Sequence, residues 1–269
     1  PATAFGADAS GHAGTGPAAG AATSAFPADT APSAGHLPAA GQAFHDAARP
    51  HDGVAPHAGA DAIYTGSDIL TRREDRQHAP LSLMQQRLYF LESITPGTPV
   101  YNTPSAHRLT GEMNEAAFQR AFDQLCQRQP ILRTVIRTDD QGMPQQTVLD
   151  SLDVSLFPAV DLANLSGQAQ EEALREAIDS LAQEPIPLHS TPLFRTRMFR
   201  LAEDRHVWFF MPHHIIWDGW SFDLLYQEMA ALYAHQIEKP GAADPLPPLA
   251  IDYGDFAGWH HQFLKSDTL

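Results

Sequence analysis

The stretch MPHHIIWDGWS, residues 211–221, decides how this sequence is interpreted. It places two adjacent histidines, His213 and His214, directly after the apolar run HVWFFMP, and it continues to Asp218 and Gly219. The apolar run predicts a buried strand, and the following pattern predicts a helix that Asp218 would cap. The stretch is therefore a metal site, a catalytic base with its supports, or a polar turn after a buried strand.

These three interpretations predict different neighbours for the two histidines. Adjacent strand residues point to opposite faces, so a single metal ion rarely binds both, and the later His260 and His261 match no metal spacing. In a polar turn, Asp218 would cap the helix and Gly219 would relieve backbone strain. In a catalytic site, one histidine would project into a cavity, supported by its neighbours. The residues alone leave the turn and the catalytic site open.

The composition divides the chain into two parts. Residues 1–75 are rich in Ala, Gly, Pro, Ser and Thr, with almost no Leu, Ile or Val. Such a segment buries too little apolar surface to offset its ordering entropy, which predicts a disordered interdomain linker. Residues 76–269 carry the patterns of a folded domain. Because the chain begins with Pro1, we expect it to be a piece of a longer protein.

Charge and cysteine content exclude several classes of protein. The formal net charge of -15 argues against nucleic-acid binding, which needs a basic face. No apolar run approaches the ~20 residues of a membrane span, and no signal peptide is recognisable. The lone Cys126 excludes a disulfide framework and a cysteine zinc site within the chain. These features together predict a cytoplasmic protein.

Helical and strand patterns alternate through the second part of the chain. Helices are predicted after Ser82, before Pro130, from Gly167, after Gly219, and over residues 251–264. Strands are predicted over residues 131–138, paired with 145–150, and over 192–201, paired with 206–214 across the turn AEDR. This mixture predicts an α/β or α+β fold, with a mixed sheet flanked by helices.

The stretch HHIIWDG resembles the HHxxxDG signature of the condensation domains of nonribosomal peptide synthetases, which are relatives of chloramphenicol acetyltransferase. Three further stretches follow the order of this family: LSLMQQRLYFLE resembles S-x-A-Q-x-R-L-W-x-L, RQPILRTVI resembles R-H-E-x-L-R-T-x-F, and IDYGDFAGW resembles Y-x-D-Y-A-x-W. The matching residues are Ser82, Gln86, Arg87 and Leu88, then Arg128, Leu132, Arg133 and Thr134, then Tyr253, Asp255, Ala257 and Trp259.

The sequence departs from the family in three respects. Gln129 and Pro130 stand where the second pattern has His and Glu, and Trp217 stands where a small residue is frequent, which would reshape the cavity near His214. A condensation domain is about twice as long, with two similar lobes and the reaction channel between them. This chain therefore resembles an N-terminal lobe of the chloramphenicol acetyltransferase-like fold, without the C-terminal lobe.

The resemblance implies that the chain takes part in amide formation. The amine of an aminoacyl thioester on one carrier domain would attack the acyl or peptidyl thioester on another, and the donor thiol would leave. The catalytic candidates are His214, His213, Asp218 and Gly219. His214 would act as a base or would position the amine, His213 would hold local structure, and Gly219 would offer an amide to the oxyanion or would only form the turn.

Two arginines are expected to support the site. Asp218 is expected to point away from the channel and pair with Arg133, so that Asp218→Ala would lose folding together with activity. His214→Ala would lose activity and keep the fold. Arg87, like Gln86, is expected to be structural.

The resemblance also implies partners. The chain itself would bind no metal or cofactor, and 4'-phosphopantetheine would arrive on the donor and acceptor peptidyl carrier domains, beside adjacent synthetase domains. Two alternatives remain: a noncatalytic lobe that docks carriers or neighbouring domains, and an acyltransferase of the same superfamily that uses coenzyme A thioesters. The second alternative shares HxxxDG but is not expected to show the other three patterns.

Overall fold

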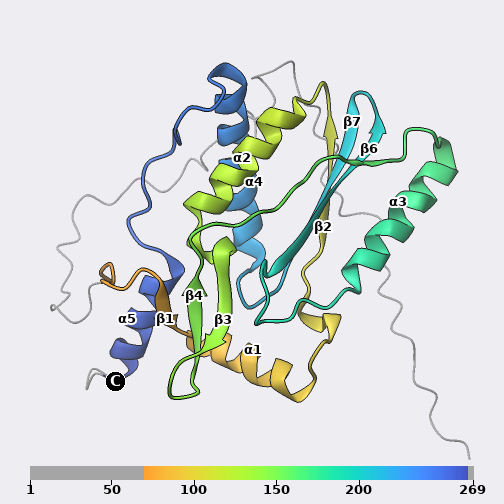
Figure 1. Ribbon diagram of the computed structural model, residues 1–269. Helices are drawn as coiled ribbons and strands as arrows, with labels where there is room; N and C mark the ends of the chain where they lie inside the picture. The colour runs from red at the N-terminus through yellow and green to blue at the C-terminus, as the bar shows by residue number, and fades with distance from the viewer. Residues whose placement is uncertain (1–69, 266–269) are drawn as a thin grey trace, which may run out of the picture. The chain divides into compact units, whose positions relative to one another are not determined.

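The computed structural model describes residues 70–265, which lie within one compact unit of the chain. The part of the predicted linker before Leu70 lies outside the described residues. The remainder contains helices and two sheets (Figure 1). Mixed helices and strands therefore confirm the predicted fold class.

The larger sheet has four strands, in the order β2 (Ser105–Thr110), β7 (Arg205–Pro212), β6 (Phe194–Ala202) and β5 (Val160–Asp161). β2, β7 and β6 are antiparallel neighbours, whereas the short β5 runs parallel to β6, so the sheet is mixed as predicted. From His206 to Pro212, every residue of the central strand β7 is buried. This continuous burial explains the apolar run that leads to the histidine pair.

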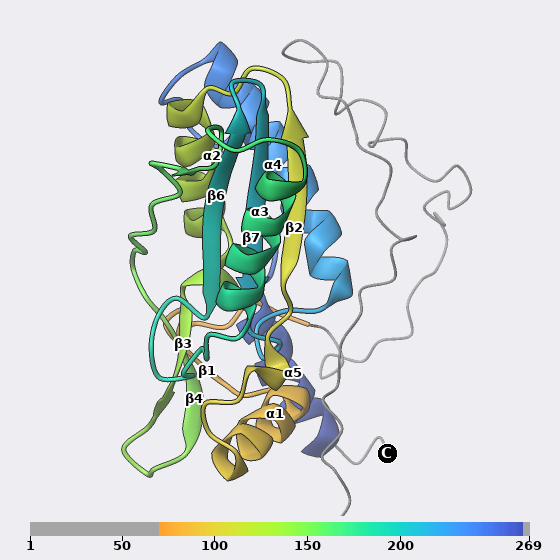
Figure 2. The same cartoon turned by 90° about the vertical axis from the view of Figure 1, so that its right-hand side faces the viewer.

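Helices cover both faces of this sheet (Figures 1 and 2). α2 (Glu115–Arg128) and α4 (Gly219–Glu238) pack together on one face, and α3 (Gly167–Ala182) lies on the other. The apolar stripe of α2, with Phe118 and Phe122, meets the rings of β7 and β6 edge to face. Burying such stripes against the sheet stabilises the layered arrangement.

The smaller sheet has three antiparallel strands, in the order β1 (His78–Pro80), β4 (Pro144–Val148) and β3 (Thr134–Thr138). The hairpin of β3 and β4 confirms the predicted pairing. However, the strand predicted from residue 131 begins only at Thr134. The preceding residues form the 3-10 helix η3 (Pro130–Arg133), because a proline is well suited to the first position of a helix.

Two helices flank the smaller sheet. α1 (Leu83–Ile94) begins at the predicted cap: the Ser82 hydroxyl accepts from the backbone of Gln85, and the Gln85 side chain accepts in return from the backbone of Ser82. α5 (Tyr253–Lys265) lies beside β1. A second 3-10 helix, η2 (Pro99–Tyr101), leads from α1 towards β2. None of the helices within residues 70–265 is long and apolar enough to cross a membrane.

Candidate functional site

The histidine pair lies where β7 leaves the larger sheet. An isolated bridge between Asn102 and His213 continues the register of β2 and β7 beyond the last ladder pair, Ser105 with Phe210. The N–H of His213 donates to Leu193 O at 2.9 Å, and that of His214 donates to Tyr101 O at 2.8 Å. The two backbones are therefore held between neighbouring segments, as expected for residues at a strand end.

The two side chains point to different environments. His213 is buried, with 1% of its surface exposed, whereas His214 is exposed. This division follows from the alternation of strand side chains and agrees with the argument against one shared metal ion. Within residues 70–265, no group of three or more His, Cys, Asp or Glu side chains could hold a metal ion.

The ring of His214 is oriented by the following turn. Its Nδ1 lies 2.5 Å from Trp217 O, and since a carbonyl oxygen only accepts, Nδ1 carries the proton. The neutral ring then has its lone pair on Nε2, which makes no hydrogen bond with the described residues. An exposed imidazole with one nitrogen fixed and the other free can accept a proton from a ligand or position it.

The ring of His213 has the opposite arrangement. Its Nδ1 accepts the N–H of Ile215 at 3.0 Å, so the neutral ring carries its proton on Nε2. That Nε2 is buried and has no partner among the described residues. Burial, together with the neighbouring His214, lowers the pKa of His213 to about 4. His213 therefore faces the interior as a neutral ring.

Asp218 has a different role from the one predicted. It is exposed and is the N-cap of α4: its Oδ1 accepts from the backbone of Ser221 at 2.9 Å and from the Ser221 hydroxyl at 2.6 Å. The expected pair with Arg133 is wrong. A surface cap of this kind contributes about 1 kcal/mol, so the expected loss of folding in Asp218→Ala is revised to a modest destabilisation.

Arg133 instead binds backbone carbonyls at the end of α2. Its guanidinium donates to Cys126 O at 3.0 Å, to Gln127 O at 3.1 Å, and to Leu149 O. The first two carbonyls belong to the last turn of α2. No helical N–H follows that could donate to them. Arg133 is 8% exposed, and burial lowers the pKa of its guanidinium. Its guanidinium therefore binds the end of α2 rather than Asp218.

Gly219 and Trp220 form the exposed start of α4. A Cβ on Gly219 would meet no atom within 4 Å, and the backbone of Gly219 is not in the left-handed region, so the turn itself does not require glycine. Trp220 is 84% exposed. Open space at Gly219 leaves room for a ligand to approach the backbone of this turn.

Trp217 does not reshape a cavity at His214 in the predicted manner. Its ring packs against Phe210 and Phe222, with 5.3 Å between ring centroids in both pairs. It lines a cavity of about 60 Å³ between α2, η3 and α4, together with Leu132 and Leu225. The large side chain thus fills space behind the turn, on the core side.

The first pattern contributes a residue that the sequence comparison misplaced. Gln85, not Gln86, occupies the glutamine position when the pattern is counted from Ser82, and it is 1% exposed. Its Nε2 donates to Ile215 O at 3.1 Å and to Gln146 Oε1 at 3.2 Å. The side chain of Arg87 is exposed and makes no hydrogen bond or ion pair with other described residues, so its expected structural role has no side-chain contact to support it.

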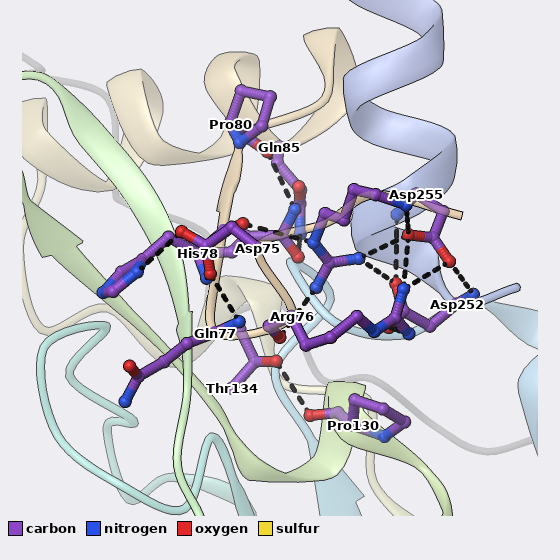
Figure 3. A network of polar contacts seen from close by, with 12 residues as sticks. Asp75, Arg76, Gln77, His78, Pro80, Gln85, Pro130, Thr134, Asp252 and Asp255 are labelled. Carbon is purple, nitrogen blue, oxygen red and sulfur yellow. Dashed lines mark hydrogen bonds and ion pairs between the residues drawn. The ribbon is translucent and has the colours of Figure 1, made fainter. Parts of the chain in front are cut away.

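An ion-pair network that was not predicted connects residues 73–76 with α5 (Figure 3). The carboxylate of Asp255 binds Arg73 at 2.9 Å and Arg76 at 2.7 Å, and Asp252 binds both arginines as well. Arg73 lies within the stretch expected to be linker, yet its backbone N–H also donates to Asp255 at 3.0 Å. Of these four residues, the sequence analysis had singled out Asp255, in the fourth pattern.

Comparison with known proteins identifies the family. The family model for the condensation domain matches residues 75–269. The chain is 37% identical over 201 residues to phosphinothricin tripeptide synthetase PhsC of Streptomyces viridochromogenes, covering 75% of this chain and 18% of that protein. The chain therefore belongs to the condensation-domain family. Condensation domains are the peptide-bond-forming domains of nonribosomal peptide synthetases, where they work beside carrier domains that bear phosphopantetheine.

Solved structures show the same fold. The X-domain in the complex of the X-domain and OxyB from teicoplanin biosynthesis is similar with a TM-score of 0.63 and 26% identity, over 76% of this chain and 41% of that one. The first condensation domain of the CDA synthetase gives a TM-score of 0.61 at 23% identity, over 70% and 47%. The chain thus spans less than half the length of these structures.

Proposed function

We propose that this chain is the N-terminal lobe of a condensation domain and, completed by a second lobe, joins an acyl or peptidyl thioester donor to an aminoacyl thioester acceptor. The observation that carries the proposal is the state of His214, which is exposed at the end of a buried strand, fixed through Nδ1, and free at Nε2. A rigid element that presents one unprotonated nitrogen is suited to proton transfer.

The chemistry assigns a limited task to His214. An α-amine has a pKa of about 7.7–8.0, so on the order of a tenth is already neutral at pH 7. Its nitrogen adds to the donor carbonyl, and the N–H then becomes acidic. Nε2 of His214 accepts that proton, or positions the amine for attack. The C–S bond then breaks, and the departing donor sulfur takes up a proton as the thiol.

The start of α4 supplies groups for the developing oxyanion. The amides of Gly219 and Trp220 make no hydrogen bond with other described residues, and they lie at the positive end of the helix. The open space at Gly219 allows a carbonyl oxygen to approach them. In this proposal the amides stabilise negative charge on the intermediate, while His214 handles the proton.

The partners follow from the family. Donor and acceptor peptidyl carrier domains would deliver both substrates on 4'-phosphopantetheine, and adjacent synthetase domains would complete the assembly. The family model and the synthetase relatives support this proposal. No Ser or Cys nucleophile is required, which agrees with Cys126, whose burial raises its pKa to about 12.

A second function, docking without catalysis, is favoured by one observation. A solved relative at 26% identity is an X-domain in complex with another protein, OxyB. A domain of this fold can therefore serve as a binding partner. The presence of both histidines with defined tautomers favours catalysis for this chain.

The experiment that separates these functions is a condensation assay on the chain extended by a second lobe. Donor and acceptor are loaded on carrier proteins, and intact mass of the acceptor carrier reports amide formation. Wild type should form product, His214→Ala should lose it while melting at the same temperature, and His189→Ala, which removes another exposed histidine, should behave as wild type. Lack of product from a folded wild type across several carrier pairs would favour docking, and product with acyl-coenzyme A in place of the donor carrier would favour the coenzyme A alternative.

A further inference from the structure

The two adjacent histidines carry their protons on opposite ring nitrogens. His214 donates through Nδ1 to Trp217 O, whereas His213 accepts at Nδ1 from the backbone of Ile215. The two bonds are 2.5 Å and 3.0 Å long, and each fixes one tautomer, because a carbonyl oxygen cannot donate and an amide N–H cannot accept. Of the nitrogens of these two rings, the proposed reaction uses only the free Nε2 of His214. The bond made by the other ring therefore needs a separate explanation.

The ring of His213 holds one end of the peptide unit that follows His214. The carbonyl of that unit, His214 O, accepts from Trp217 N at 3.4 Å, and its N–H, on Ile215, donates to the His213 ring at 3.0 Å. In a trans peptide these two groups lie in one plane and point in opposite directions. Holding both ends therefore fixes the rotation of this plane and with it the backbone of His214.

We propose that His213 is a positioning residue: its Nδ1 acts as a hydrogen-bond acceptor that fixes the backbone of His214 and thereby the direction of the reactive Nε2. The proposal rests on the proposed function for its catalytic consequence, whereas its structural statement concerns this chain alone. Of the two ring nitrogens of His213, only Nδ1 has a hydrogen-bond partner among residues 70–265, so Nδ1 carries the positioning role.

The buried Nε2–H of His213 strengthens this assignment. A buried donor without an acceptor is unfavourable, and His213 is 1% exposed. An apolar side chain of similar size would avoid that cost. The bond that Nδ1 makes to the turn offsets this cost and gives the imidazole a function at this position.

Three substitutions separate the acceptor from the rest of the ring. His213→Asn places its Oδ1 on Cγ, where Nδ1 stood, and keeps the acceptor. His213→Gln moves its amide one bond further out, towards the former Nε2, and His213→Leu keeps the bulk with no acceptor. If the Leu variant fails to fold, the Asn and Gln variants, which carry the same amide, still make the comparison.

Nitrogen NMR of the 269-residue chain with labelled histidine reads the result without substrate. In wild type, His213 should carry its proton on Nε2 and His214 on Nδ1. His213→Asn should leave His214 in one tautomer, whereas His213→Gln and His213→Leu should give a mixture. A merely structural role would lower stability without changing the His214 tautomer. A proton on Nδ1 of His213, or an unchanged His214 in all three variants, would overturn the proposal.

The kinetic test uses the protein extended by the second lobe. His213→Asn should stay within about tenfold of wild type in kcat, and His213→Gln should lose about 100-fold with little change in KM, as misplacement of a reacting group by about 1 Å predicts. The reverse order of the two variants would contradict the assignment. If the wild type itself forms no amide, the proposed function fails, while the tautomers still decide the inference.

Discussion

Acid sensitivity of the fold should depend on His213. Its pKa in the folded protein is about 4, below its ordinary value of 6.5, because the ring is buried beside His214. Between these two values the unfolded chain binds a proton that the folded one does not, so stability falls as the pH falls from 6.5 towards 4. At about 1.4 kcal/mol for each pKa unit, the full effect is about 3 kcal/mol, of which about 2 kcal/mol appears between pH 7 and pH 5.

The comparison of wild type with His213→Asn isolates this contribution. Urea unfolding of both proteins at pH 7 and pH 5 gives four free energies of unfolding, provided that each transition is two-state. The wild type should lose about 2 kcal/mol more than the variant on acidification. His107 and His206, whose pKa values are also lowered by burial, remain in both proteins and cancel. Equal losses in the two proteins would refute a neutral, buried His213.

Three further substitutions, one of them with a control variant, test other parts of the structure. Asp218→Ala removes an exposed helix cap, and it should fold and lose about 1 kcal/mol of unfolding free energy in urea. Asp255→Ala leaves Arg73 and Arg76 paired with Asp252 alone, and its unfolding free energy should fall by about 2 kcal/mol, whereas the control Asp75→Ala, which removes an exposed carboxylate, should lose less than about 1 kcal/mol. Trp217→Ala enlarges the existing cavity behind the turn and should cost about 3–5 kcal/mol, seen as a lower melting temperature; a loss below about 1 kcal/mol would contradict its place in the core.

The elements of the fold were predictable where burial leaves a regular apolar pattern in the sequence. The stripe of α2 repeats at helical spacing, and β7 is continuously apolar, so both were recognised from the sequence. The strand predicted from residue 131 was wrong at its start because apolar alternation in ILRT does not distinguish a strand from a 3-10 turn. Pro130 was the available signal, since proline favours the first position of a helix.

The sequence predicted that the two histidine side chains point to different sides, but it did not predict which groups the site residues bind. The alternation of strand side chains correctly separated His213 from His214, and their opposite tautomers were set by backbone groups that no pattern displays. The partner of Arg133 was wrong because an aspartate at a helix start and an arginine elsewhere suggest an ion pair. The position of Arg133 shortly after the end of α2 was the better guide, since such residues bind the last carbonyls of a helix.

Residues from three of the four family patterns meet in one polar network behind the histidine turn. Asp255 of the last pattern holds Arg73, whose guanidinium donates to His78 O in β1. β1 is in turn joined to β4 by the bond from Gln146 to Pro80 O (Figure 3).

From there, the first pattern reaches the site itself. Gln85 binds Gln146 on one side and Ile215 O on the other, so the residue after His214 is held through both of its peptide groups. A second hydrogen bond joins the first and last patterns directly: the Ser82 hydroxyl lies 2.9 Å from the Tyr253 hydroxyl. Substitution far from His214 can therefore disturb it, because each link in this network is a buried or half-buried hydrogen bond whose loss leaves a polar group unpaired. The residues of the turn alone therefore do not fix the orientation of the His214 ring.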